Sequence, residues 1–329
     1  MFDVTALGEV LIDFTAAGKS ESGEVQFERN PGGAPANVLA ALAKLGKKTA
    51  FIGKVGNDQF GHYLHSVLSK NNINTKGLVF SNEINTTLAF VHLDEQGDRS
   101  FSFYRNPGAD MMLKEQEVNL ELLDHTRIFH FGTISMTDEP AASATLMAIK
   151  YAKEKGQLIS FDPNLRVNLW GNLSRAKEMF TIGLRYANVL KVSEEELEFI
   201  SGSKDPQRGT AYIYDRFHTE LIFVTMGGEG CFYRFGEKVG KCSGYKVESI
   251  DTTGAGDAFL AGVLYQILEY NRSLSELTLN DVKQIVLFAN AVGALATTKK
   301  GAIPAMSLIE EISALRDSQV LIKRGMESL

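Results

Sequence analysis

Short apolar runs alternate with longer amphipathic segments along most of the chain. Six runs have the length and apolar content of buried strands: Val4–Leu7, Ala50–Val55, Ile128–Phe131, Leu158–Phe161, Asn188–Val192 and Leu221–Thr225. Segments with helical spacing lie between or after them: Ala36–Leu45, Phe60–Lys70, Glu139–Lys155, Arg175–Tyr186, Ala255–Tyr270, Asn280–Thr297 and Ser307–Arg316. This alternation is typical of a mainly parallel sheet with helices on both faces. The pattern therefore predicts a doubly wound α/β fold.

Two stretches depart from this pattern. Val10–Arg29 is β-like and contains scattered glycines, and Thr87–Arg105 consists of two alternating runs joined by a polar turn at Gly97. Period-two alternation across a polar turn indicates a hairpin with one covered face. We therefore expect inserted strands at about 10–30 and 87–106 to form a small β-sheet lid. With no Pro/Ser-rich linker or repeat, the prediction is a single domain over 1–329.

Composition and charge narrow the class of protein. The 329 residues are 44% hydrophobic and carry a net charge of −6, without a long basic run. This argues against a nucleic-acid-binding or anionic-membrane surface. The opening MFDVTALGEV has the pattern of a strand rather than a signal peptide, and no apolar stretch reaches the ~20 residues of a membrane span. Cys231 and Cys242 flank an expected hairpin and are predicted to be reduced, so we expect a cytoplasmic protein.

The strongest chemical signal is Asp251-Thr-Thr-Gly-Ala-Gly-Asp-Ala-Phe259, which opens an apolar helix. A helix N-terminus presents unpaired N–H groups and the positive end of the helix dipole. Glycines at 254 and 256, with Ala255 between them, let a phosphate approach the backbone closely. Asp257 then lies in the first turn, within reach of a hydroxyl that attacks a bound phosphate.

Other interpretations of this segment exist. It could be a tight turn followed by an acid that the helix dipole favours. A dinucleotide fingerprint requires glycine where this chain has Phe259, and the sequence contains no G-x-x-x-x-G-K-[ST] motif. The phosphate-binding interpretation therefore does not involve a P-loop.

A second motif, Asn30-Pro-Gly-Gly-Ala-Pro-Ala-Asn37, lies near the start of the chain. Gly32 and Gly33 expose backbone just before a helix whose first turn contains Asn37. A polyol needs short donors and acceptors at close range, and these groups supply them. The alternative is an ordinary loop that leads into an Ala-rich packed helix.

Together and in this order, the two motifs resemble those of the PfkB-type, ribokinase-like carbohydrate kinases. The resemblance extends from the first strand to Gly301. It implies a doubly wound α/β domain with a β-lid, ATP as phosphoryl donor, Mg²⁺ and phosphorylation of a hydroxymethyl group. It also suggests a homodimer that joins through the lid.

The resemblance assigns a role to several residues. Asp257 matches the catalytic base, and the Gly254–Gly256 backbone matches the anion hole. The residues that match sugar contacts are Asp13, Gly32, Gly33 and Asn37. Thr225-Met-Gly-Gly-Glu-Gly230, with Gly227, resembles the loop along ATP, and Asn290 lies in the segment that resembles the adenine side.

Other assignments depend on weaker matches. Lys191-Val-Ser-Glu-Glu-Glu196 resembles a region near the phosphates, but Ser193 replaces the family's asparagine. Ser193 and Glu196 also have the spacing of a capping box, which explains both residues equally well. The resemblance gives Glu196 an indirect role at Mg²⁺ and gives Asp251 and Thr253 a role in binding K⁺.

The substrate prediction depends on two further segments. Phe101–Leu113 and Phe161–Arg166 are similar to the fructokinase branch. Arg105 could reach the sugar, and Arg166 could face the sugar or the transferring phosphoryl group. We therefore predict phosphorylation of D-fructose at the 6-hydroxyl. The alternatives are a 2-keto-3-deoxygluconate kinase or another sugar or nucleoside kinase, and a non-catalytic sugar or nucleotide sensor.

Overall fold

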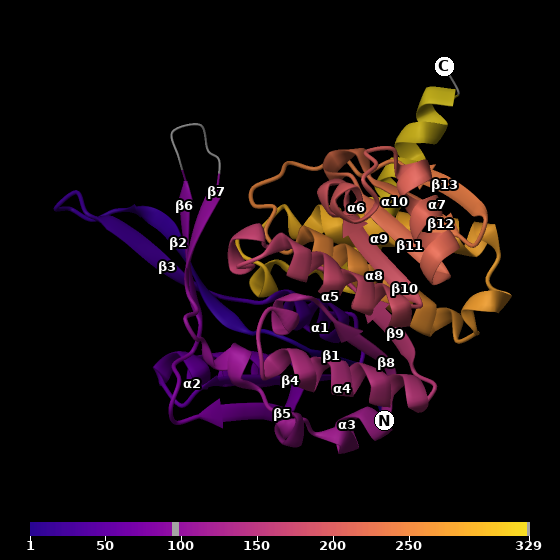
Figure 1. The fold of residues 1–329 in the computed structure, drawn as a ribbon. Helices are drawn as coiled ribbons and strands as arrows, with labels where there is room; N and C mark the ends of the chain where they lie inside the picture. Colours follow the sequence, from indigo (N-terminus) through magenta and orange to yellow (C-terminus); the bar gives the residue numbers. More distant parts are fainter. Residues whose placement is uncertain (94–98, 328–329) are drawn as a thin grey trace.

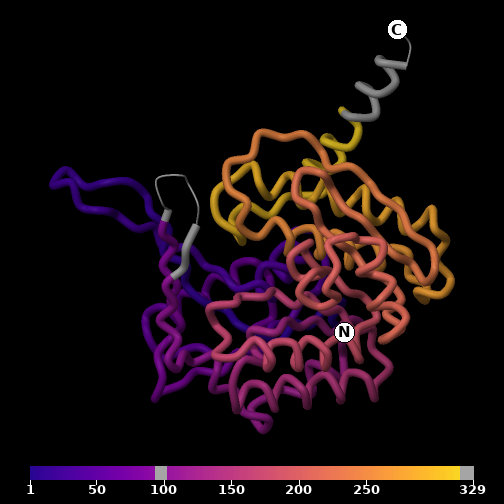
Figure 2. The backbone as a smooth tube through the Cα atoms, turned by 45° about the horizontal axis from the view of Figure 1, so that its top comes forward, coloured from indigo at the N-terminus to yellow at the C-terminus, as the bar shows by residue number. Residues whose placement is uncertain are grey.

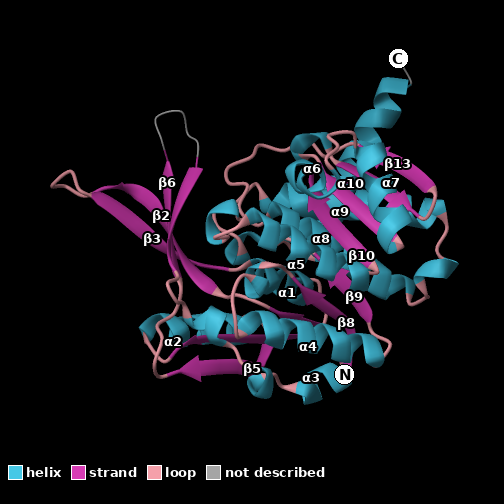
Figure 3. Ribbon diagram, in the orientation of Figure 1, coloured by secondary structure: helices cyan, strands magenta, loops and turns pink. Residues whose placement is uncertain are grey.

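The computed structural model describes residues 1–93 and 99–327. The predicted turn at Gly97 and the last two residues of the predicted 1–329 domain lie outside the described residues. The described strands form two sheets, one large and one small, and helices pack around the large one (Figure 3).

The large sheet has nine strands in the order β13-β12-β11-β10-β9-β8-β1-β4-β5. Their bounds are β1 Phe2–Leu7, β4 Thr49–Gly56, β5 Ile73–Ser81, β8 Thr126–Phe131, β9 Leu158–Phe161, β10 Val189–Ser193, β11 Leu221–Thr225, β12 Cys231–Phe235 and β13 Lys238–Cys242. The pairs from β5 to β11 are parallel, whereas β12 and β13 add an antiparallel edge. The register places Ser193 opposite Thr225 and Cys231 opposite Cys242.

Helices cover both faces of this sheet. Their bounds are α1 Ala34–Lys44, α2 Gln59–Lys70, α3 Leu120–Asp124, α4 Ala141–Glu154, α5 Leu173–Tyr186, α6 Glu194–Ser201, α7 Pro206–Phe217, α8 Ala255–Tyr270, α9 Leu279–Ala296 and α10 Ile309–Glu327. Two apolar clusters follow this division: one contains residues of α1, α2, α8 and α9, and the other contains residues of α3 to α7. The strands are apolar on both sides because both faces are buried.

The small sheet has the order β3-β2-β6-β7 and projects from one side of the large sheet (Figures 1 and 2). Its strands are β2 Leu11–Lys19, β3 Val25–Gly32, β6 Leu88–Leu93 and β7 Arg99–Tyr104. Strands β2, β6 and β7 fall within the two stretches where the sequence predicted inserted strands, and β3 continues to Gly32, two residues beyond the predicted end at about residue 30. The predicted fold class, a doubly wound α/β sheet with a small second sheet, is confirmed.

Local sequence determines where the functional elements begin. Helix α1 starts at Ala34, two residues before its predicted start. Pro35 lies in its first turn, where backbone N–H groups have no partner within the helix, so the N–H that proline lacks costs no hydrogen bond. Helix α8 has its predicted bounds because Gly254 adopts the left-handed conformation that precedes its first turn (φ 76°). Strand β5 and helices α3, α6 and α7 were not predicted.

The strand order reverses next to β1. From β1 the chain extends the sheet through β4 and β5, then returns to place β8 on the other side of β1. In sheets of this kind, ligands bind beyond the carboxyl ends of the strands at such a reversal. Among the described residues, no helix is long and apolar enough to cross a membrane.

Candidate active site

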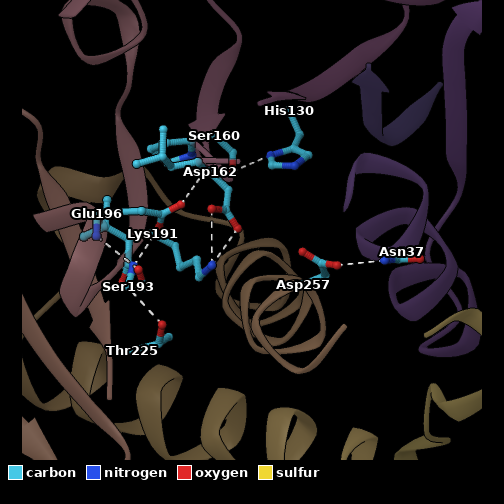
Figure 4. Close-up of polar contacts among 12 residues, drawn as sticks. Asn37, His130, Ser160, Asp162, Lys191, Ser193, Glu196, Thr225 and Asp257 are labelled. Atoms are coloured by element: carbon cyan, nitrogen blue, oxygen red, sulfur yellow. Dashed lines mark hydrogen bonds and ion pairs between the residues drawn. The ribbon is translucent and has the colours of Figure 1, made fainter. Parts of the chain in front are cut away.

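Asp257 lies in the first turn of α8, at the carboxyl ends of the strands. Its carboxylate is buried, with 8% of the residue exposed, and its Oδ2 accepts a hydrogen bond of 2.8 Å from Asn37 Nδ2 on α1 (Figure 4). Burial raises the pKa of Asp257, while Lys191 and the hydrogen bond from Asn37 partly offset this rise. A raised pKa makes an ionised carboxylate a stronger base.

The amide of Asn37 has one oxygen without a partner. Its Nδ2 donates to Asp257, but its buried Oδ1 has no hydrogen-bond partner among the described residues. A buried polar atom of this kind normally receives a hydrogen bond. The orphaned oxygen lies beside the proposed base, so a hydroxyl donor of a bound sugar fits here.

Asp13 on β2 lies against the two glycines of the Asn30–Asn37 motif. A β-carbon on Gly32 would overlap the Asp13 carboxylate, and one on Gly33 would overlap the carbonyl oxygen of Glu9. Gly33 also has φ 115°, which an L side chain rarely adopts. Close approach of chain segments thus requires glycine at both positions and leaves Asp13 next to the motif.

Arg166 lies in the field of both carboxylates. Burial raises the pKa of Asp13 to about 7, and the positive charge of Arg166 opposes that rise. The same arginine lowers the pKa of Asp257, although burial dominates there. Arg166 is exposed and follows β9, and its Nη1 donates to the carbonyl oxygen of Leu165 at 3.2 Å. Its predicted contact with a sugar or a phosphoryl group stays a prediction.

Lys191 extends from β10 to the amino end of α8 (Figure 4). Its Nζ pairs with the fully buried Asp162 at 3.0 Å, and a β-carbon on Gly256 would lie 2.9 Å from the same nitrogen. Burial lowers the pKa of Lys191, but the carboxylates of Asp162, Glu196 and Asp257 outweigh it and raise the pKa. Lys191 therefore remains a cation beside the predicted anion hole.

Ser193 and Glu196 form the capping box that their spacing predicted. Ser193 Oγ accepts the N–H of Glu196 at 3.2 Å, and Glu196 Oε2 accepts the N–H of Ser193 at 2.8 Å. Glu196 Oε1 also accepts the N–H of Leu165 at 2.7 Å, which fixes the loop after β9. These contacts explain both residues structurally, and the indirect role of Glu196 at Mg²⁺ stays a prediction.

A cavity of about 600 Å³ lies beside the amino end of α8. Six of the predicted residues line it: Thr225, Gly227, Gly230, Ala255, Gly256 and Asn290. The other lining residues, which the sequence did not single out, are Gly228, Gly244, Tyr245, Lys246, Val247, Ser249, Thr252, Phe259, Gly293, Ala294 and Thr297. The lining combines apolar side chains, such as Val247 and Phe259, with glycine backbone, such as that of Gly227, and this combination fits a nucleotide.

Asn290 positions one wall of this cavity. Its Nδ2 donates to the carbonyl oxygens of Cys242 and Ser243 at 3.2 and 3.1 Å. These contacts hold the chain just after β13, where Gly244 and Tyr245 line the cavity. The amide nitrogen of Asn290 is thus occupied by the protein, and its oxygen is the atom left for a base.

Asp251 connects the loop before α8 to the loop at Gly301. Its Oδ1 accepts hydrogen bonds from Thr253 N–H at 2.9 Å and Thr253 Oγ1 at 2.7 Å, and its Oδ2 accepts the N–H of Gly301 at 2.9 Å. The structure thus brings together the predicted K⁺ residues, but as partners of one another. Within the described ranges, no group of three His, Cys, Asp or Glu side chains has a metal-binding arrangement.

Arg105 has protein partners for each of its nitrogens. Nε donates to Asp110 at 2.7 Å, Nη1 to the Thr137 hydroxyl at 3.0 Å and Nη2 to the carbonyl of Ile134 at 2.9 Å. The residue is 8% exposed. Its predicted contact with a sugar stays a prediction, because its known partners belong to the protein.

Three further residues of this site were not predicted from the sequence. Asp162 holds Lys191, Asn164 donates a hydrogen bond to Asp257, and Glu9 accepts the Ala34 N–H at 2.9 Å. Asn164 also has φ 52°, a strained conformation for a residue other than glycine. Asp162 and Asn164 lie in a quoted motif, Phe161–Arg166, directly after an apolar strand, which is the signal that could have found them.

The chain is similar to known proteins in both sequence and fold. A sequence profile described as "pfkB family carbohydrate kinase" matches residues 1–308. The chain belongs to the pfkB carbohydrate kinase family. It is 44% identical over 305 residues to "Probable fructokinase-2" of Arabidopsis thaliana, covering 92% of each chain.

Solved structures of this family share the fold. A fructokinase from Xylella fastidiosa with bound ATP has a TM-score of 0.88 and 32% identity, over 97% of this chain and all of that one. A fructokinase double mutant from Vibrio cholerae O395, with fructose, ADP and potassium ion bound, has a TM-score of 0.85 and 33% identity, over 95% and 98% of the chains. These findings confirm the predicted family and identify the chain as an ATP-dependent carbohydrate kinase.

Proposed function

We propose that this protein is a fructokinase, which transfers the γ-phosphoryl group of ATP to the 6-hydroxyl of D-fructose. The observation that carries the proposal is the position of Asp257. A carboxylate of raised pKa lies beside the amino end of α8, next to the orphaned amide oxygen of Asn37. Fructokinases among the relatives give the substrate.

We infer that fructose binds between the two sheets. Asp13 accepts hydrogen bonds from sugar hydroxyls, Asn37 Oδ1 accepts another, and the backbone at Gly33 approaches the ring closely. Arg166 lies where it can bind the sugar or the transferring phosphoryl group. Each of these contacts suits an uncharged polyol, which offers hydroxyl donors to carboxylate and amide oxygens.

Asp257 acts as the general base in this proposal. The 6-oxygen of fructose forms a bond to the γ-phosphorus as the bond from that phosphorus to the bridging oxygen of ATP breaks. The proton of the 6-hydroxyl passes to Asp257, and ADP leaves with the electron pair of the broken bond. General-base assistance contributes about 10²–10⁴-fold in rate.

Phosphate charge is stabilised by groups of the chain itself. We infer that the N–H groups of Gly254 and Gly256 and the cation of Lys191 face the terminal phosphates of a nucleotide in the adjoining cavity, whereas the N–H of Ala255 donates to the carbonyl oxygen of Thr252 at 3.2 Å. Oriented donors of this kind stabilise the charge that develops in phosphoryl transfer. Glu196 would be an indirect partner of a Mg²⁺ ion that accompanies the nucleotide, and such an ion would neutralise further phosphate charge. Asp251 and Thr253 would lie near a K⁺ ion.

A coupled assay of ADP release tests the proposal. We expect turnover of fructose by the purified protein with ATP and Mg²⁺, at a kcat/KM well above those for 2-keto-3-deoxygluconate, ribose and adenosine. A preference for 2-keto-3-deoxygluconate would identify the alternative kinase. Binding of sugar and ATP without ADP release would identify a non-catalytic sensor.

The lid is the proposed dimer surface. Val25, Phe27 and Tyr104 on its strands are 53%, 39% and 68% exposed, and apolar side chains on an exposed sheet favour pairing with a second copy. Light scattering of wild type and Phe27→Ser measures the mass.

A kinase that uses ATP, with two cysteines outside any disulfide, fits a cytoplasmic location, and we infer no nucleic-acid or membrane partner.

A further inference from the structure

One peptide unit at the start of α1 makes two hydrogen bonds in opposite directions. It consists of the carbonyl group of Gly33 and the N–H of Ala34, which lie in one plane because the peptide bond is rigid. The carbonyl oxygen accepts the backbone N–H of Asn37 at 2.9 Å, the first hydrogen bond of the helix. The N–H donates to Glu9 Oε1, also at 2.9 Å. Glu9 thus fixes the orientation of the peptide unit with which the helix begins.

Glu9 takes the place of a local helix cap. Gly33 occupies the N-cap position of α1, and no side chain of that position caps the helix. A cap usually comes from the N-cap residue itself, which accepts an N–H of the first turn. Here the acceptor belongs to the loop between β1 and β2, 25 residues earlier in the chain. The start of α1 is therefore fixed to this loop.

The peptide unit needs such a partner because Gly33 is conformationally permissive. Its φ of 115° and ψ of 120° lie outside the regions that L residues adopt, and glycine populates several other conformations at similar cost. Glu9 is only 2% exposed, and a hydrogen bond is stronger where water is excluded. The buried oxygen of Glu9 therefore selects one orientation of the peptide unit.

This orientation matters for the candidate base. Asn37 lies one turn after Gly33, and its Nδ2 donates to Asp257 Oδ2 at 2.8 Å (Figure 4). A rotation of the Gly33–Ala34 peptide unit would break the hydrogen bond to the backbone N–H of Asn37 and displace its amide. Misplacement of groups at a reacting centre by ~1 Å can lower a rate about 10²-fold.

We propose that Glu9 is a positioning residue for phosphoryl transfer: by holding the Gly33–Ala34 peptide unit, it places the amide of Asn37 against Asp257. This inference rests on the proposed function, in which Asp257 is the base. Glu9 acts through Asn37 and not by contact with the substrate. What the site requires at position 9 is therefore an oxygen acceptor that reaches the Ala34 N–H, and the negative charge is secondary.

Two variants of Glu9 separate reach from charge. Glu9→Gln keeps the length and an oxygen acceptor but removes the carboxylate, so kcat with fructose should stay close to the wild-type value. Glu9→Asp keeps the carboxylate but is one methylene too short to reach the Ala34 N–H. We expect its kcat to fall about 10- to 100-fold. KM for ATP should stay unchanged, because the described residues that line the nucleotide cavity lie outside α1.

A double-mutant cycle tests whether Glu9 acts through Asn37. In Asn37→Ala the amide that Glu9 positions is absent, so the addition of Glu9→Asp should lower kcat by no more than about twofold. Two independent effects would multiply instead. A purely structural role of Glu9 would give the same fold-loss in both backgrounds.

Asp205→Ala is the matched control for the loss of a cap. Asp205 caps α7, whose first turn also contains a proline, and it accepts the N–H of Gln207 at 2.8 Å. Loss of this cap should lower the melting temperature and leave kcat unchanged. Thermal unfolding reports whether each variant is folded. If Glu9→Asp does not fold, Glu9→Met, which keeps the length without an oxygen acceptor, replaces it in every comparison.

Three results would overturn the inference: wild-type kcat in folded Glu9→Asp, a kcat of Glu9→Gln as low as that of Glu9→Asp, or equal fold-losses with and without Asn37. The expected order of kcat together with the loss of additivity supports it. If the wild type turns over 2-keto-3-deoxygluconate, ribose or adenosine instead of fructose, the proposed function fails, and the same ratios with that substrate still test Glu9. Absence of turnover with all four overturns both.

Discussion

The Nζ of Lys191 lies 2.9 Å from the position that a β-carbon on Gly256 would occupy. Strand β10 and helix α8 are thus brought together at one point, where a cation meets the positive end of a helix dipole. Two positive features are stable side by side only because Asp162 pairs with Lys191 and Glu196 and Asp257 lie nearby. An added phosphate would complete this arrangement of charges.

Gly256→Ala tests the contact directly. The methyl group should displace Lys191 Nζ and enter the space for phosphate, so we expect kcat to fall about 10²-fold. Stability should change by less than about 1 kcal/mol, because alanine favours a helix and the displaced group is the end of a flexible side chain. Steady-state kinetics and thermal unfolding measure the two effects.

Gly171→Ala is the matched control, since a β-carbon there meets no atom within 4 Å. It should leave kcat and the melting temperature nearly unchanged. Normal kcat in Gly256→Ala would mean that the amino end of α8 does not hold the transferring phosphate.

Lys191→Met should cost both stability and activity. It leaves Asp162, which is fully buried, without its partner, and breaking a buried pair from one side costs about 3–5 kcal/mol. The double variant Lys191→Met/Asp162→Asn should regain most of the stability, measured by urea unfolding, but not the kcat. Recovery of kcat in the double variant would show that Lys191 acts only through folding.

Arg175→Met serves as the comparison. Arg175 and Glu178 form an ion pair at 2.9 Å whose side chains are 40% and 58% exposed. Exposed pairs contribute about 0–1 kcal/mol, so the unfolding free energy should change little.

The sequence predicted the elements whose patterns are local. The helix Ala255–Tyr270 was predicted to the residue because glycines precede an unbroken apolar surface, and the capping box at Ser193 and Glu196 follows from spacing alone. Helix α7 was missed because it contains Gly209 and buries only one large apolar side chain, Ile213, and α6 is only two turns long. Strand β5 was missed because the polar residues Asn74, Thr75 and Lys76 interrupt its apolar pattern.

Contacts between distant segments could not be predicted from the chain. Asn37 and Asp257 are 220 residues apart, and Arg105 donates to Thr137 and Ile134, which lie 32 and 29 residues further along the chain. Asp162 was missed for the same reason, since only the fold places it against Lys191. Sequence motifs indicated which residue types carry the chemistry, and the fold determined which of them are neutralised.

Asp257→Asn should remove the base while keeping the shape of the site. Asparagine retains an oxygen that can accept the hydrogen bond from Asn37, so KM for fructose should change only a few-fold. We expect kcat to fall about 10²–10⁴-fold. Asp138→Asn, which alters an exposed carboxylate, should retain wild-type kinetics, and near-normal turnover of Asp257→Asn would eliminate the proposed base.

Fructose binding should depend on pH through Asp13. Burial raises the pKa of Asp13 from 3.8 to about 7, so the residue is protonated in the free protein at pH 6 and ionised at pH 8. Because the ionised form accepts two sugar hydroxyls, we expect calorimetry to show fructose binding about tenfold weaker at pH 6 than at pH 8. In Asp13→Asn this pH dependence should be largely lost, together with most of the affinity.

The raised pKa of Asp13 also affects the stability of the fold. Stability should fall as the pH rises, whereas fructose binding should strengthen. Between pH 3.8 and about 7 the folded state binds the proton of Asp13 more tightly than the unfolded state does. Its contribution to stability is therefore fully present below pH 3.8 and is lost as the pH rises through 7. Asp13→Asn should melt at a higher temperature than the wild type at pH 8, with a smaller difference at pH 5. If instead the variant melts at a lower temperature than the wild type at pH 8, the folded protein stabilises the ionised carboxylate. The pKa of Asp13 is then not raised, and the predicted pH dependence of sugar binding is wrong.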